Sequence, residues 1–107
     1  MAMNPSEFEG LADATIERIA RLVEESGAEC DCESKGSGVL EITFANRSRI
    51  IVNRHSAAQE IWVAAMSGGF HFRPVGSDWV DTRDRRELLA VLSELITRQS
   101  GSAVALR

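Results

Sequence analysis

The sequence predicts an α+β fold, a two-layer α–β sandwich in which two terminal helices pack on one face of an antiparallel sheet of five to six strands. Both ends of the chain carry apolar residues at spacings of three and four, which is typical of amphipathic helices. The region between them contains short runs that alternate apolar and polar residues. The turns between these runs are too short for parallel crossovers, so neighbouring strands must be antiparallel. Since neither helix can bury its stripe alone, one face of the sheet must cover both, which leaves the other face to solvent or a partner.

The first helix is predicted over residues 8–25. Its apolar stripe consists of Phe8, Leu11, Ala12, Thr15, Ile19, Leu22 and Val23. Ser6 is the expected N-cap, and Glu9, three positions later, would complete a capping box. Pro5 keeps the helix from extending further upstream. Gly27 is expected to end the helix in the left-handed conformation that glycine adopts easily.

The alternating runs that follow Gly27 predict the strands, and turn residues such as "KGSG" and "NRS" divide them. The expected strands cover residues 28–33, 39–45, 49–54, 60–66, 70–74 and a short run at 79–81. Leu40, Ile42 and Phe44 should share one face of their strand, because side chains two apart point the same way.

The second helix is predicted over residues 84–99, with Asp84 as its cap and Gly101 as its stop. Its apolar stripe consists of Leu88, Leu89, Leu92, Leu95 and Ile96. We expect one domain over residues 1–107, with a core from about residue 6 to residue 100. Residues 102–107 form a short tail that either packs or frays.

Composition and charge indicate the cellular compartment and the classes of partner to expect. No stretch approaches the roughly 20 apolar residues that span a bilayer, and the N-terminal residues lack a secretory signal, so we expect a cytoplasmic protein with no membrane partner. Two cysteines without an export signal agree with a reducing compartment. Residues 1–33 carry nine acidic and two basic residues, a net charge of −7, whereas the rest of the chain sums to +3. Such an acidic end disfavours nucleic acid as its partner and favours cations or a basic protein surface.

The segment "GAECDCESKG" holds both cysteines of the chain. On a strand, Cys30 and Cys32 share one face, and the three acids Glu29, Asp31 and Glu33 share the other. A disulfide between the cysteines would span about 6.6 Å between Cα atoms with nearly parallel side chains, which is unfavourable. A zinc site would need two more ligands at a suitable spacing, which the sequence does not offer. Buried, inert thiols are therefore the expectation.

The three acids of this strand have two interpretations, which the residue pattern alone leaves open. Charge on an edge strand protects the sheet against pairing with other chains. The same carboxylates, next to the acids of the first helix, would also form a weak, open site for hard or borderline cations.

Several segments, taken in order, resemble the bacterial frataxin family, the CyaY proteins. They are "SEFEGLAD", "DCE", "GVLEITFANRSRIIVNR", "EIWVAAMSGGFHF" and "WVDTRDRRELLAVLSEL". The resemblance covers about residues 6–100, and "EIWVAAMSGGFHF" with "WVDTR" is its most specific part. It implies the α–β sandwich and a role in iron–sulfur cluster assembly. It also implies weak binding of ferrous and ferric iron to an acidic ridge, and docking on a cysteine desulfurase and on the scaffold protein.

The family's acidic ridge combines acids of the first helix and the first strand. Carried onto this chain, its residues are Asp13, Glu17, Glu24, Glu25, Glu29, Asp31 and Glu33. Arg18, Ala20 and Arg21 occupy the middle of the helix, so this ridge is thinner than in many relatives.

A second family surface is the exposed face of the sheet, where the resemblance places Asn53 and Trp62 towards the scaffold. Trp62 alternates with Ile61 and Val63, so it points away from the core if they point in. An outward Trp is a good binding anchor, although it would also be explained by lying flat over neighbouring strands.

This surface departs from the family pattern. Relatives usually have Gln followed by Pro two residues later, where this chain has His55 and Ala57. His71 lies between Phe70 and Phe72, so it should face outward if they are core. For His55 and His71 we expect solvated or locally hydrogen-bonded roles, with accessory metal ligation as the alternative.

No signature of an enzyme appears in the sequence: no nucleophile elbow, P-loop, dinucleotide fingerprint or zinc-protease motif. We therefore expect a non-enzymatic protein, with any ferroxidase activity incidental. The first hypothesis is an iron-binding donor or regulator in cluster assembly. The alternative is a purely protein-interaction module that regulates the desulfurase, with incidental metal binding. Without heptads or a large apolar patch, a monomer is expected.

Overall fold

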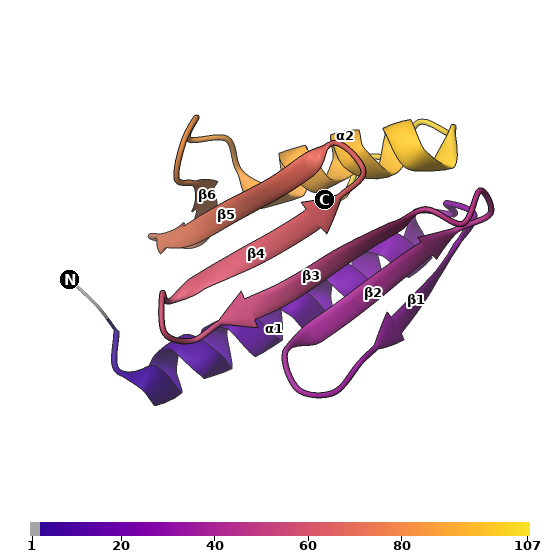
Figure 1. The fold of residues 1–107 in the computed structure, drawn as a ribbon. Helices are drawn as coiled ribbons and strands as arrows, with labels where there is room; N and C mark the ends of the chain where they lie inside the picture. Colours follow the sequence, from indigo (N-terminus) through magenta and orange to yellow (C-terminus); the bar gives the residue numbers. More distant parts are fainter. Residues whose placement is uncertain (1–2) are drawn as a thin grey trace.

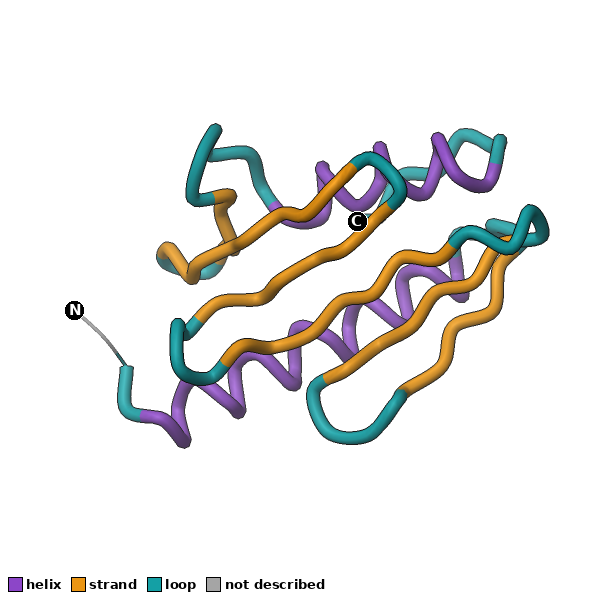
Figure 2. The backbone as a smooth tube through the Cα atoms, viewed as in Figure 1, coloured by secondary structure: helices purple, strands orange, loops and turns teal. Residues whose placement is uncertain are grey.

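The computed structural model describes residues 3–107, which form two helices and six strands. In chain order they are α1 (Pro5–Glu25), β1 (Cys30–Ser34), β2 (Val39–Phe44), β3 (Arg49–His55), β4 (Glu60–Ala65), β5 (Gly68–Val75), β6 (Asp78–Asp81) and α2 (Leu88–Ser100). The strands form one antiparallel sheet in the order β1–β2–β3–β4–β5–β6. Both helices lie on the same face of this sheet, behind it in Figure 1, and short loops join the strands (Figure 2). The predicted two-layer sandwich is confirmed.

The core lies between the sheet and the two helices. α1 packs over β1, β2 and β3, and α2 reaches β6. Alternate residues of each central strand are buried, as the period of two requires. Hydrophobic side chains with at most 1% of their surface exposed come from both layers: Phe8, Ala12, Ile19, Val23, Leu40, Ile42, Ile50, Val52, Ile61, Val63, Phe72, Leu88, Leu92 and Ile96.

The buried face of α1 is rotated slightly from the predicted stripe. Ile16 is buried, whereas Leu11 is 38% exposed and lies on the flank of the helix. Thr15 sits at the edge of the core, where its hydroxyl donates to the carbonyl of Leu11 and accepts a hydrogen bond from Trp79 Nε1 at 2.9 Å. That bond satisfies the only polar atom of the Trp79 side chain, which is otherwise buried against Phe8.

The helix starts differ from the predicted ones, and capping geometry explains both. For α1, the expected N-cap Ser6 is wrong: Asn4 is the N-cap, and its Oδ1 accepts from the amide of Glu7 at 2.9 Å. Pro5 then takes the first helical position, where its missing N–H costs nothing. Gly27 follows the end of α1 with a φ of 77°, as expected for a glycine in that place.

For α2, the expected cap Asp84 is also wrong. Glu87 is the N-cap and accepts from the amide of Leu89 at 3.0 Å. Asp84 belongs to the preceding turn, where its carboxylate accepts from the amide of Arg86. A helix cannot start there because Arg85 has a φ of 63° and Glu87 still bridges to Val80.

The C-terminal tail packs. Leu106 is 5% exposed, and its amide donates to Ser93 Oγ at 2.9 Å. Thr97 Oγ1 both accepts from the amide of Val104 and donates to its carbonyl. Gly101, with a φ of 79°, reverses the chain so that the tail runs back along α2. Within residues 3–107, no helix combines the length and apolar character that crossing a membrane requires.

Candidate functional site

β1 forms one edge of the sheet, since within residues 3–107 it pairs only with β2. Its side chains alternate as expected. Cys30 and Cys32 are half-buried and pack against the core on the helix side, while Asp31 and Glu33 are exposed on the outer side. Glu29, just before the strand, is exposed as well.

The two cysteines are free, half-buried thiols. Burial, together with the neighbouring Cys30 and Glu24, raises the pKa of the Cys32 thiol from 9.0 to about 11. Burial, and then the charge of Asp31, raises the pKa of Cys30 also. Because the thiolate is both the nucleophile and the metal ligand, these environments disfavour both roles near neutral pH.

Five of the seven predicted ridge residues have no ion-pair partner among residues 3–107. All five are exposed: Glu17, Glu24, Glu25, Glu29 and Asp31. Glu24, Glu25, Glu29 and Asp31 lie in one region of the surface, because the end of α1 leads through a short loop into the start of β1. A hollow of about 260 Å³ at this corner is lined in part by Glu29, Asp31 and Thr43.

Asp13 is the ridge residue that the structure places differently. Its carboxylate accepts a hydrogen bond from the guanidinium of Arg54 on β3, which also donates to Ser37 Oγ at 3.2 Å. Arg54 passes directly over Gly38, where a Cβ atom would lie 2.8 Å from the Arg54 side chain. The charge of Asp13 is therefore paired with that of Arg54. Any side chain larger than that of glycine at position 38 would force Arg54 to shift.

Glu33 also has a partner, because Lys35 Nζ lies 3.4 Å from its carboxylate, but both side chains are largely exposed and the pair is weak. Nowhere in residues 3–107 do three or more metal-binding side chains gather closely enough to hold a metal ion. The acids thus form an open, strongly negative surface along the end of α1 and the β1 edge. Such a surface can attract cations or basic protein surfaces, but it is not a coordination cage.

On the outer face of the sheet, Trp62 stands between two imidazoles. Its ring stacks on His55 of β3 with centroids 3.8 Å apart, and on His71 of β5 with centroids 4.3 Å apart. The rings are nearly parallel, at 13° and 8°. Trp62 Nε1 donates to Glu60 Oε1 at 2.8 Å, and the same oxygen lies 3.8 Å from His71 Nδ1. Trp62 faces outward as predicted, but it is half-buried by its neighbours, and Asn53 lies opposite it on β3.

The partners of Asp13 and Trp62 were not predicted from the sequence. Alternation places Arg54 on the helix side of β3, in line with Ile50 and Val52, but it does not show that Asp13 lies within reach. The stack on Trp62 follows from register, since His71 is paired directly with Trp62 and His55 is paired with Glu60. The stack depends on the strand pairing, and the Asp13–Arg54 contact depends on how α1 packs on β3.

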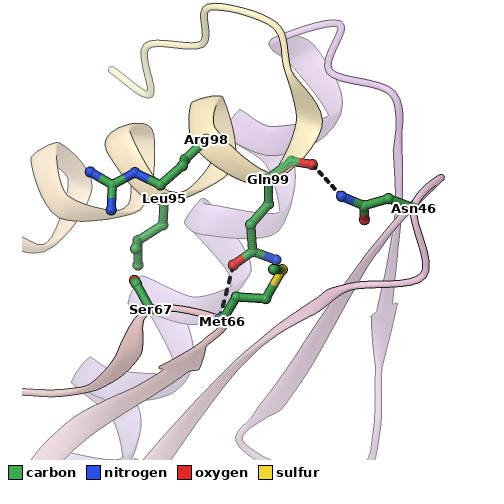
Figure 3. A pocket seen from close by; sticks show the side chains of 6 residues that line it. All are labelled: Asn46, Met66, Ser67, Leu95, Arg98 and Gln99. Atoms are coloured by element: carbon green, nitrogen blue, oxygen red, sulfur yellow. Dashed lines mark hydrogen bonds between the residues drawn. The ribbon is translucent and has the colours of Figure 1, made fainter.

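A hollow of about 250 Å³ lies between the end of α2 and two turns of the sheet (Figure 3). Gln99 organises it. Its side-chain oxygen accepts from the amide of Met66, and its main-chain carbonyl accepts from Asn46 Nδ2. Gln99 Nε2 donates to Ser48 Oγ and to the carbonyl of Arg49. These bonds account for the buried Gln99 as a structural residue that joins α2 to the turns.

Comparison with known proteins gives a consistent result over nearly the whole chain. A family model described as a frataxin-like domain matches residues 1–102. The iron-sulfur cluster assembly protein CyaY of Dechloromonas aromatica is 54% identical over 105 residues, which are 98% of this chain and 100% of that protein. The protein of the same name from a Janthinobacterium species is 46% identical, over 98% of this chain and 97% of the relative.

Solved structures agree with the fold. Frataxin from Psychromonas ingrahamii superposes with a TM-score of 0.91 at 34% identity, covering 98% of this chain and 99% of that one. A structure of trimeric frataxin from the yeast Saccharomyces cerevisiae, complexed with ferrous iron, gives a TM-score of 0.74 at 24% identity, covering 86% and 87% of the two chains. At that identity the likeness concerns the fold alone.

Proposed function

Because the chain belongs to the frataxin-like family, we propose that it acts in iron–sulfur cluster assembly, as an iron-binding donor or regulator of the cysteine desulfurase–scaffold complex. The relatives at 54% and 46% identity carry the name of cluster assembly proteins. The observation that carries the proposal for this chain is the group of exposed, unpaired carboxylates at the end of α1 and on the β1 edge. Iron would be the cargo of this surface, held weakly by carboxylate oxygens.

The desulfurase would dock on the same acidic surface through a basic patch of its own. Electrostatic docking of this kind depends on ionic strength, and iron would compete for the carboxylates. The scaffold would contact the outer face of the sheet around Trp62 and Asn53. We place the protein in the cytoplasm and propose a monomer, without nucleic-acid or membrane partners, and we propose no catalytic role, with any ferroxidase activity incidental.

A second candidate is a purely protein-interaction module that regulates the desulfurase, with incidental metal binding. Two observations favour it: the described residues 3–107 bring no three metal ligands together, and Asp13 is engaged by Arg54. Both candidates need the acidic surface for docking, so iron binding alone distinguishes them.

The docking claim is tested by charge reversal on the two opposite edges of the sheet. Asp31→Lys on β1 and Asp78→Lys on β6 change the net charge equally, and both side chains are exposed. We expect Asp31→Lys to weaken binding of purified desulfurase at low salt, and the combination of Glu29→Lys, Asp31→Lys and Glu33→Lys to abolish it. Asp78→Lys should bind nearly as the unmodified protein does. Equal effects of the two single changes would show that only net charge matters, and unchanged binding by the triple variant would refute docking on this edge.

A further inference from the structure

The stack of His55, Trp62 and His71 does more than hold a tryptophan on the sheet. We propose that His55 and His71 are positioning residues that make Trp62 a proton-responsive anchor, so that docking on a carboxylate-bearing surface of the scaffold strengthens as the pH falls. This inference rests on the proposed function, because it concerns the regulation of the same docking face.

The geometry provides the first step. β3, β4 and β5 lie side by side (Figure 1). On the outer face, the three rings form one column across these strands. Histidine is the side chain that ordinarily changes charge between about pH 5 and 8. With centroid separations of 3.8 and 4.3 Å, each protonated imidazole would lie within the range of a cation–π contact with the indole. Trp62 is therefore held from both sides in either state, while the charge of the column changes.

The charged groups around the stack set the sign of the response. Glu60 is paired with His55 in the register and lies 3.8 Å from His71 Nδ1. Arg73 follows two residues after His71 on the same strand and faces the same side. Arg83 donates to the carbonyl of Gly69 at 2.9 Å, but its guanidinium lies over Phe70 on the core-facing side of β5.

More distant are Asp78, near the far end of β6, and Glu9 of α1, which accepts from Ser56 Oγ beyond the β3–β4 turn. Near the rings on this face, Glu60 and Arg73 leave the local charge close to zero with neutral imidazoles. Protonation of both rings adds two positive charges, which favours carboxylates on the partner.

Each imidazole also has a contact that reports its own protonation. His55 Nδ1 accepts from the amide of Ala58 at 3.2 Å, a bond that a proton on Nδ1 removes. His71 Nδ1, once protonated, becomes a donor towards Glu60 Oε1, the oxygen that already accepts from Trp62 Nε1. The amide of Ala58 and the indole N–H of Trp62 are thus two independent sensors.

The first experiment uses the isolated protein. We expect the NMR signals of the Ala58 amide and the Trp62 indole N–H to shift between pH 8 and pH 5, and the Ala58 amide to lose protection against exchange. Trp62→Phe identifies the indole signal, because Trp79 supplies the other one. In the double variant His55→Gln with His71→Gln both pH-dependent shifts should disappear. Sensors that do not respond in the unmodified protein, or respond equally in the double variant, overturn the inference without touching the proposed function.

The second experiment measures docking of purified scaffold at pH 6 and pH 8. For each protein we take the affinity at pH 6 divided by the affinity at pH 8. In the double variant, this ratio reports only the titration of groups on the scaffold. We expect the ratio for the unmodified protein to be about two- to tenfold larger, which is the size of one or two exposed charge pairs. An equal or opposite ratio overturns the inference. Trp62→Ala should lose docking at both pH values; if it docks normally, the docking face in the proposed function is wrong.

Discussion

Arg54 on β3 donates a hydrogen bond from its guanidinium to the carboxylate of Asp13 on α1, 41 positions away in the sequence. The Arg54 side chain is 17% exposed, and the contact ties the helix layer to the sheet. It also removes Asp13 from the set of free acids, although the family resemblance places it on the acidic ridge. Most of the ridge carboxylates without an ion-pair partner therefore lie at the end of α1 and the start of β1.

Replacing Arg54 should be costly for stability. We expect Arg54→Gln to lower the free energy of unfolding by about 1–2 kcal/mol, because it leaves the partly buried Asp13 without a charged donor. Urea denaturation measures the change. Arg49→Gln is the matched control, since Arg49 is 59% exposed and reaches Glu41 only at 3.5 Å. Its cost should stay below about 0.5 kcal/mol, and a similar loss for both variants would contradict the role given to Arg54.

The thiols should react slowly in the folded protein. Since the pKa of Cys32 is raised to about 11, almost no thiolate is present at pH 7.5, and alkylation by iodoacetamide should be much slower than in the urea-unfolded chain. The native rate should climb as pH rises towards 11. Cys32→Ser isolates the rate of Cys30.

The same shift has a consequence for stability. A thiol whose pKa is raised on folding contributes stability that is complete below its unfolded value of 9.0 and is lost as pH rises through about 11. Stability of the unmodified protein should therefore decline over this window more than that of Cys32→Ser. For the preceding prediction, an alkylation rate of the folded protein at pH 7.5 equal to that of the unfolded chain would contradict the low reactivity expected for the two thiols.

The tail should contribute to stability despite its length. Leu106→Ala removes a side chain that is 5% exposed, and we expect a loss of about 2–3 kcal/mol, at the low end for a buried leucine. Leu11→Ala on the flank of α1 is the control, because Leu11 is 38% exposed and alanine favours a helix. The measurement is the midpoint of thermal or urea unfolding. Equal midpoints for Leu106→Ala and the unmodified protein would show that the tail does not pack in solution.

Hydrophobic periodicity was sufficient to predict the sandwich, because alternation in strands such as β2 and the spacing in α2 depend only on local geometry. The helix starts were not predictable in the same way. Asn4 and Ser6 are both good caps, and the backbone conformation of Arg85 decided against Asp84. Such choices depend on the turn as a whole, which a single residue type does not specify.

The candidate site was predictable in part for a related reason. Alternation correctly separated Cys32 from Asp31, since it requires only that the segment be a strand. The contacts of Trp62 depend on which strands are neighbours and in which register, and the contact of Asp13 depends on how α1 packs on β3. Local patterns carry neither kind of information. The sequence thus indicated which residues are polar and outward, whereas the structure showed which of them are already engaged.

The most direct test of the central claim, that iron meets the carboxylates of the α1–β1 corner and not the thiols, is an anaerobic titration of Fe²⁺ followed by amide NMR signals. We expect selective paramagnetic broadening at residues 24–31, with Asp13 affected later because Arg54 engages it. Mg²⁺ at the same concentration controls for ionic strength, and Cys30→Ser with Cys32→Ser should leave the pattern unchanged. Uniform or absent broadening, or broadening that disappears with the cysteines, would contradict the account.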